Sequence, residues 1–161
     1  MPAVLEIENL RIGWTDSAGE HVIVDGVSMA IQAGEILGIV GESGSGKTLS
    51  MLAVLGLLPA PLTVLGGSIQ ISGSPVTPAT APGMRGKRAA MVFQDPMTSL
   101  NPVFTVGAQI AEAVTLHQGL KGRAAMDAAV DALRKVQVPD PERRAKQYPH
   151  ELSGGMRQRV M

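Results

Sequence analysis

The chain contains no cysteine and very few aromatic residues: one tryptophan, one tyrosine and two phenylalanines. Without cysteine it can form no disulfide, no thiolate metal site and no cysteine-ligated iron-sulfur cluster. With so few aromatic rings, its core must be built from aliphatic and methionine side chains.

An excess of charge of one sign is also missing, because 14 basic residues balance 14 acidic ones. This balance argues against a general electrostatic grip on nucleic acid or anionic lipid, so any anion binding must be local. Apolar stretches such as 51–58 are much shorter than the about 20 residues of a membrane-spanning helix. Glu6 and Glu8 stand where a signal peptide would be basic and then apolar. We therefore expect neither secretion nor membrane insertion, and any membrane association would come through partners.

The 161 residues are enough for one domain or part of one. Alternating apolar and polar residues predict two strands of an antiparallel layer, and short apolar runs predict strands of a parallel central sheet. The expected strands are 3–8, 22–31, 36–40, 67–73 and 89–93. The expected helices are 47–57, 106–117, 123–136 and 142–147. A segment rich in proline and small residues, 74–83, is expected to be a surface loop.

The segment Gly41-Glu-Ser-Gly-Ser-Gly-Lys-Thr48 fits the Walker A pattern and lies between an expected buried strand and an expected helix. Its glycines let the backbone turn several N–H groups toward phosphate oxygens, and the helix adds its positive N-terminal end. Lys47 would reach the β- and γ-phosphates, and the Thr48 hydroxyl would ligate Mg²⁺. The alternative is an ordinary glycine-rich turn with a solvated lysine. Even a phosphate loop does not by itself distinguish kinases, GTPases and transport ATPases.

A second candidate anion site lies far downstream, at Leu152-Ser-Gly-Gly-Met-Arg-Gln158. Ser153 is a good helix N-cap, and Gly154 and Gly155 would expose backbone N–H groups at the start of a helix. The simpler alternative is a helix cap without a ligand. Between the two sites, Gln94 ends an expected strand just before Asp95-Pro96, where regular structure must stop.

The string LSGGMRQR resembles the signature motif of ABC transporter ATPases. The strings YPHELSGGMRQRVM and MVFQDPMTSLNP (91–102) are similar to those of the peptide and nickel importer ATPases. Two such ATPases work as a pair, and because Met156 stands where the second tends to carry glutamine, this chain resembles the first. The resemblance implies an α/β fold, a P-loop NTPase of the ABC ATPase type, with a mixed central sheet, an antiparallel β layer and a helical subdomain. We expect residues 1–93 to form the nucleotide-binding core, 94–152 the Q-loop and helical subdomain, and 153–161 the start of the signature helix.

The resemblance also implies roles for single residues. Gln94 would contact magnesium or the attacking water, and Ser153 would help bind the γ-phosphate of ATP held by an opposite subunit in a head-to-tail dimer. Trp14, expected in the loop between the first two strands, would stack on adenine, or else pack on the sheet. The predicted catalytic residues are Lys47 and Gln94, and the predicted metal ligands are Thr48 and Gln94. The predicted nucleotide contacts are Trp14, Gly41, Ser43, Gly44, Ser45, Gly46, Lys47, Thr48, Leu49, Ser153, Gly154 and Gly155.

The function implied by the resemblance is an ATP-binding subunit that powers import of peptides or a related small solute. Its cofactors would be ATP and Mg²⁺. Its partners would be a second ATPase subunit, two membrane-spanning permease subunits and, indirectly, an extracytoplasmic solute-binding protein. The permeases would hold it at the cytoplasmic face of the inner membrane. A soluble ABC protein of DNA repair or translation would carry different residues around the signature, so we expect no nucleic acid partner.

The family pattern continues beyond residue 161, with the Walker B aspartate, the catalytic glutamate and the switch histidine. These residues orient the metal and the nucleophile during phosphoryl transfer. We therefore expect the C-terminal part of the core to be missing, and the 161-residue chain alone to be unstable and to hydrolyse ATP no faster than background. The alternative function is a nucleotide-binding fragment or regulatory remnant without hydrolysis.

Overall fold

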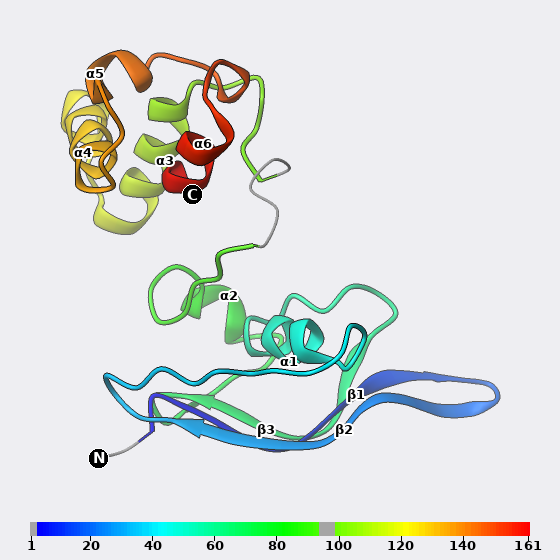
Figure 1. Ribbon diagram of the computed structural model, residues 1–161. Coiled ribbons are helices and arrows are strands. Elements are labelled where there is room, and N and C mark those ends of the chain that lie inside the picture. The colour runs from blue at the N-terminus through cyan, green and yellow to red at the C-terminus, as the bar shows by residue number, and fades with distance from the viewer. Residues whose placement is uncertain (1–2, 94–98) are drawn as a thin grey trace. The chain divides into compact units, whose positions relative to one another are not determined.

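A computed structural model describes residues 3–93 and 99–161 of the chain. The chain divides into two compact units, Met1–Ala90 and Met91–Met161 (Figure 1). This division groups residues 153–161 with the preceding helices. The finer division at 93 and 152 stays a prediction.

The first unit is built on a four-stranded sheet in the order β2-β1-β3-β4. The strands are β1 (Leu5–Asp16), β2 (Gly19–Ile31), β3 (Thr63–Ile71) and β4 (Ser74–Pro75). All three strand pairings are antiparallel. The predicted antiparallel layer is therefore confirmed, although β1 is about twice as long as the 3–8 segment expected from alternation alone. The segment 74–83 is not wholly loop, because it contains β4 and the start of a short helix, α2 (Ala81–Met84).

Helix α1 (Lys47–Val54) lies with α2 on one side of the sheet (Figure 1). The helix ends at Leu55, and Gly56 follows with φ 61°, a left-handed conformation that glycine adopts without steric cost. Apolar side chains from both helices and three strands form the core of this unit, which removes their surface from water. The buried core residues are Ile7, Leu10, Ile12, Val24, Ala53, Val54, Ile69, Ile71 and Met84.

The predicted strands at 36–40 and 89–93 do not form. The first segment has no regular secondary structure, and Ile36 and Val40 are 96% and 94% exposed. In the second segment Ala89 makes only an isolated bridge to Arg85, and Val92 is exposed. An apolar run becomes a buried parallel strand only when neighbouring strands satisfy its backbone on both sides. No strand in the described part of the chain pairs with either segment.

The second unit is helical. Its helices are α3 (Val106–Gln118), α4 (Gly122–Lys135), α5 (Pro141–Arg144) and α6 (Gly154–Val160), with a 3₁₀ turn at Pro149–Glu151. The predicted helices are confirmed, except that α5 ends three residues before 147. The buried core residues of this unit are Val106, Leu133, Val138, Ala145 and Leu152. Among the helices of residues 3–93 and 99–161, not one combines the length and apolar character needed to cross a bilayer.

Helix α4 buries a narrow stripe of side chains. Ala125, Ala129 and Leu133 are buried at a spacing of four residues, which places them in one row on the helix. The nearby apolar residues Met126 and Val136 are 38% and 40% exposed. They lie at the margin of the buried face rather than within it.

Candidate functional site

The phosphate loop at 41–46 leads directly into helix α1. Gly44 and Gly46 have φ angles of 83° and 86°, the left-handed region that favours glycine. Gly46 has a second reason to be glycine, because a Cβ atom there would lie 2.6 Å from Cγ2 of Val24 on β2. The end of the loop is thereby packed against the sheet.

Lys47 closes this loop on itself. Its Nζ donates hydrogen bonds to the carbonyl oxygens of Gly41 and Glu42, at 2.8 and 2.6 Å, and to Oγ of Ser45 at 3.0 Å. The lysine charge therefore lies inside the turn of the loop and does not extend into solvent. These three oxygens use all three N–H donors of the ammonium group, so a phosphate oxygen would have to replace one of them.

A hollow of about 140 Å³ opens beside the lysine and is lined by residues 44–49. It includes the first turn of α1, whose N-cap is Gly46 and which has no side-chain cap. Uncapped N–H groups and the positive end of a helix suit an anion. Thr48 is exposed at this helix start, where its hydroxyl is free to approach a metal held with phosphate. The local geometry thus fits a polyphosphate with Mg²⁺. It brings residues 44–49 of the predicted contacts around one hollow, which Gly41 and Ser43 do not line.

Trp14 does not lie in a loop, as expected from the sequence, but within β1, directly opposite His21 of β2. β1 runs eight residues beyond Glu8, where the strand expected from alternation ends, because irregularities in the β1–β2 register near Leu10, Ile12 and Gly13 allow pairing to continue. The indole is only partly exposed, and its ring stacks on the His21 imidazole with a centroid separation of 4.6 Å. Packing on the sheet and stacking on a ligand are therefore compatible for this residue.

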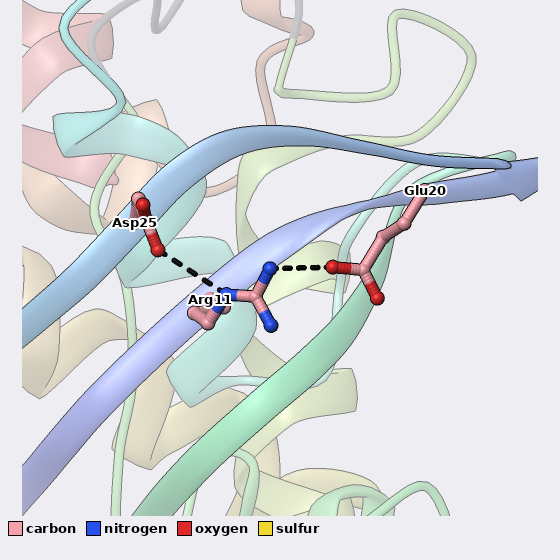
Figure 2. Close-up of polar contacts among 3 residues, drawn as sticks. All are labelled: Arg11, Glu20 and Asp25. Carbon is pink, nitrogen blue, oxygen red and sulfur yellow. Dashed lines mark hydrogen bonds and ion pairs between the residues drawn. The ribbon is translucent and has the colours of Figure 1, made fainter.

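The hairpin that carries Trp14 is held by an ion-pair cluster that sequence reasoning missed. Arg11 of β1 lies between two carboxylates of β2, with 2.5 Å from Nη2 to Glu20 Oε1 and 3.2 Å from Nε to Asp25 Oδ1 (Figure 2). The hydrogen bond and charge of Glu20 raise the pKa of Arg11 above its ordinary value. The alternating charges of the two strands are the sequence signal, but only the register shows which of them meet.

The signature segment lies in the second unit and forms a helix start as predicted. Ser153 is the N-cap of α6, and its Oγ accepts a hydrogen bond of 3.3 Å from the Met156 N–H. Gly154 and Gly155 are exposed, and a Cβ atom at either position would meet nothing within 4 Å. The space above this helix start is therefore open, while the position of Gln94, the third predicted site, lies outside the described residues.

His150 packs within this segment. Its ring stacks on Tyr148 with a centroid separation of 5.7 Å, and the Tyr148 N–H donates to Glu151 Oε2 at 2.7 Å. These local contacts order the turn that precedes Ser153.

Comparisons with known proteins identify chains that are similar to this one. The chain is 44% identical over 162 aligned residues to the dipeptide transport ATP-binding protein DppD of Escherichia coli strain K12, covering 99% of this chain and 50% of that protein. It is 45% identical to DppD of Haemophilus influenzae, covering 99% of this chain and 49% of that protein. The chain thus spans about half the length of the curated relatives it matches.

Solved structures share the fold. A dimeric structure of MJ0796, a bacterial ABC transporter cassette, superposes with a TM-score of 0.78, and a dimeric post-hydrolysis state of MJ0796 bound to ADP and Pi with 0.76. Each is 22% identical in sequence, with 97% of this chain and 66% of that chain covered. The fold is accordingly α/β, a P-loop NTPase of the ABC ATPase type. A model of the family described as ABC transporter matches residues 24–161, which is most of the sequence, so the chain belongs to the ABC transporter family.

Proposed function

We propose that this chain is part of the ATP-binding subunit of a transporter that imports peptides or a related small solute. The observation that carries this proposal is the phosphate loop, where Lys47, two left-handed glycines and an uncapped helix converge on one hollow. The relatives whose names specify dipeptide transport support the substrate class. In the complete protein, ATP binding and hydrolysis would drive the transport cycle.

The roles within the site follow from what each group can do. Lys47 and the N–H groups of residues 44–49 would hold the β- and γ-phosphates, because they present positive charge to the same hollow. Thr48 would ligate Mg²⁺, which when bound neutralises phosphate charge. Trp14 would receive the adenine ring. Gln94 remains assigned by resemblance alone, as a contact to magnesium or the attacking water.

Ser153, Gly154 and Gly155 would bind the γ-phosphate of a nucleotide held by a second ATPase subunit in a head-to-tail dimer. Support comes from the open N-terminus of α6 and from the dimeric state of the similar cassette. Two permease subunits would anchor the complex at the cytoplasmic face of the inner membrane, and a solute-binding protein outside would deliver the solute.

A second candidate is a nucleotide-binding module that does not hydrolyse ATP. We propose that this 161-residue stretch by itself hydrolyses ATP no faster than background. Steady-state phosphate release by this stretch and by the complete polypeptide separates the two candidates.

The test of the proposed function is Mg²⁺-dependent ATP binding, measured by calorimetry on the complete polypeptide. Lys47→Ala should weaken ATP binding about tenfold to a hundredfold, since a charge-assisted hydrogen bond contributes roughly 1.5–3 kcal/mol. Lys87→Ala is the matched control, because it removes the same charge from an exposed position in the same unit. Equal affinity in the wild type and the Lys47 variant would contradict the proposal.

Ser153→Ala should separate binding from assembly. It should leave the ATP affinity of the monomer unchanged and reduce ATP-dependent dimer formation, measured by light scattering after size-exclusion chromatography. The same loss of ATP affinity as in the Lys47 variant would place Ser153 in a different role.

A further inference from the structure

The indole ring of Trp14 is covered on one side by its neighbour across the hairpin. The ring planes of Trp14 and His21 lie 12° apart with a centroid separation of 4.6 Å, so the two rings are stacked. This stack follows from the register, in which the two residues are directly paired. One face of the indole is therefore occupied, and a flat ligand can stack only on the other.

The edge of the same indole is held by Asp16. Trp14 Nε1 donates to Asp16 Oδ2 at 3.3 Å, and Nε2 of His21 lies 3.1 Å from the same oxygen. The Ala18 N–H donates to the other oxygen, Oδ1, at 2.7 Å. The Ala18 hydrogen bond and then the His21 side chain lower the pKa of Asp16, so at neutral pH the group is a carboxylate that accepts from the indole N–H and lies beside the His21 ring. Asp16 thus fixes Trp14 and His21 relative to one another.

The backbone beneath these rings allows little movement. A Cβ atom at Gly13 would lie 1.9 Å from the carbonyl oxygen of His21, so glycine permits this close approach of the strands. Arg11 holds the same two strands together through Glu20 and Asp25 (Figure 2). Further along β2, Val24 pairs with Ile12 and also lies against Gly46. The hairpin that presents Trp14 is thereby in direct contact with the phosphate loop.

We propose that His21 and Asp16 are positioning residues for the nucleobase. They lock the plane of the Trp14 indole, so that adenine stacks on the face opposite His21 without any prior ordering of the side chain. When the tryptophan ring is already fixed, binding of the base does not have to immobilise that side chain, so less conformational entropy is lost. This inference rests on the proposed function, because it takes Trp14 as the ring that receives adenine.

The test compares two ligands that share phosphates but differ in the base. Dissociation constants of ATP and inorganic tripolyphosphate, each with Mg²⁺, are measured by calorimetry on the complete polypeptide. His21→Ala and Asp16→Asn should each weaken ATP binding about threefold to tenfold and leave tripolyphosphate binding unchanged. His21→Phe should recover most of the ATP affinity because it restores a flat ring beneath the indole. His117→Ala, in the other unit, is the control for loss of a histidine.

Fluorescence gives a readout that a general loss of fold would not imitate. The emission of Trp14 is isolated by subtracting the spectrum of Trp14→Phe from that of the wild type. His21→Ala should shift this emission to longer wavelength before ligand is added, since the indole loses its cover, while circular dichroism stays unchanged. ATP should then perturb the emission less than in the wild type, whereas tripolyphosphate should leave it unchanged in both.

The outcomes separate the inference from the proposed function. If Trp14→Ala weakens ATP binding selectively but His21→Ala and Asp16→Asn do not, the positioning role is wrong and the proposed function stands. Equal weakening of ATP and tripolyphosphate by the hairpin variants would likewise overturn the positioning role. If the wild type binds neither ligand, the proposed function fails and takes the inference with it.

Discussion

At the scale of single residues, the molecule presents charged groups whose environment is fixed by a few short contacts. Asp16 is the clearest case, because one carboxylate accepts hydrogen bonds from the Ala18 N–H and the Trp14 indole and pairs with His21. Its exposure does not prevent this, since backbone and ring donors are held in place by the hairpin turn.

The lowered pKa of Asp16 predicts a pH-dependent contribution to stability. The folded-state pKa lies below the ordinary value of 3.8, so the contribution is present above that pH and is lost as the pH falls through the folded-state pKa. Asp16→Asn should lower the unfolding temperature modestly at pH 7, and the difference from wild type should vanish in acid. Thermal unfolding followed by tryptophan fluorescence at stepped pH measures this.

Asp127→Asn, which removes one carboxylate from the exposed side of α4, controls for the change in net charge. A difference between wild type and Asp16→Asn that is the same at every pH would show that the hydrogen bonds and not the ionisation matter.

Residues whose roles depend on local rules could be predicted from the sequence. The glycines of the phosphate loop and the Ser153 cap follow from spacing over a few positions, and the structure confirms the left-handed glycines and the cap. The pairing of Trp14 with His21 could not be predicted. It depends on the β1–β2 register, which shifts at Ile12 and Gly13 where alternation gives no signal.

At the scale of elements, the junction between the phosphate loop and α1 depends on one glycine more than on the others. Gly44 and Gly46 share almost the same φ angle, but only Gly46 faces a buried neighbour, Val24. The two positions therefore separate backbone strain from steric overlap.

Gly44→Ala should cost about 1–2 kcal/mol of stability from left-handed strain alone. Gly46→Ala should cost roughly 1–3 kcal/mol more, because its methyl group overlaps Cγ2 of Val24. The double variant Gly46→Ala/Val24→Ala should lose less stability than the sum of the losses of Gly46→Ala and Val24→Ala, since truncating Val24 removes the overlap. Urea unfolding without nucleotide measures the free energy of unfolding of the wild type, the three single variants and the double variant. Equal losses of stability in Gly44→Ala and Gly46→Ala would refute the steric account.

The elements that the sequence predicted well are those that need no distant partner. Helices α3 and α4 begin and end within one residue of their expected bounds, because amphipathic spacing and local stop signals define them. The strand predicted at 36–40 was wrong because a strand depends on distant partners. Its apolar run fits a buried strand, but a strand exists only with neighbours, and composition cannot say whether they are present.

At the scale of the whole molecule, two units with separate cores are joined in one chain, and the first of them exposes an apolar segment. The side chains of Ile36, Leu37, Ile39 and Val40 are exposed within five consecutive residues. An extended apolar stretch without a paired backbone is a ready site for association between chains.

Replacing Ile36 and Val40 by threonine should therefore slow aggregation of the 161-residue chain, because threonine keeps the branched shape but lowers the apolar area. Static light scattering during incubation at 37 °C would measure the rate. The control replaces Val103 and Leu116, which are 69% and 73% exposed but do not belong to one continuous apolar stretch. Equal slowing by both pairs would mean that total exposed apolar area, and not this segment, governs association.

The fold class could be predicted at this scale because its motifs are dense and specific, whereas the expected divisions at 93 and 152 stay predictions. Whether residues such as Met91 group with the sheet or with the helices depends on contacts between distant parts of the chain, and motif spacing does not contain that information.

In the proposed site, the three oxygens that surround Lys47 would make nucleotide binding an exchange of hydrogen-bond partners. The ammonium group already has acceptors in Gly41, Glu42 and Ser45, so an incoming phosphate gains only the difference between its own oxygens and those it displaces. Charged phosphate oxygens win this competition against neutral carbonyls, and the margin grows with the number of phosphates. A nucleoside without phosphate has no charged oxygen to replace these acceptors, so Lys47 would keep its hydrogen bonds to the loop.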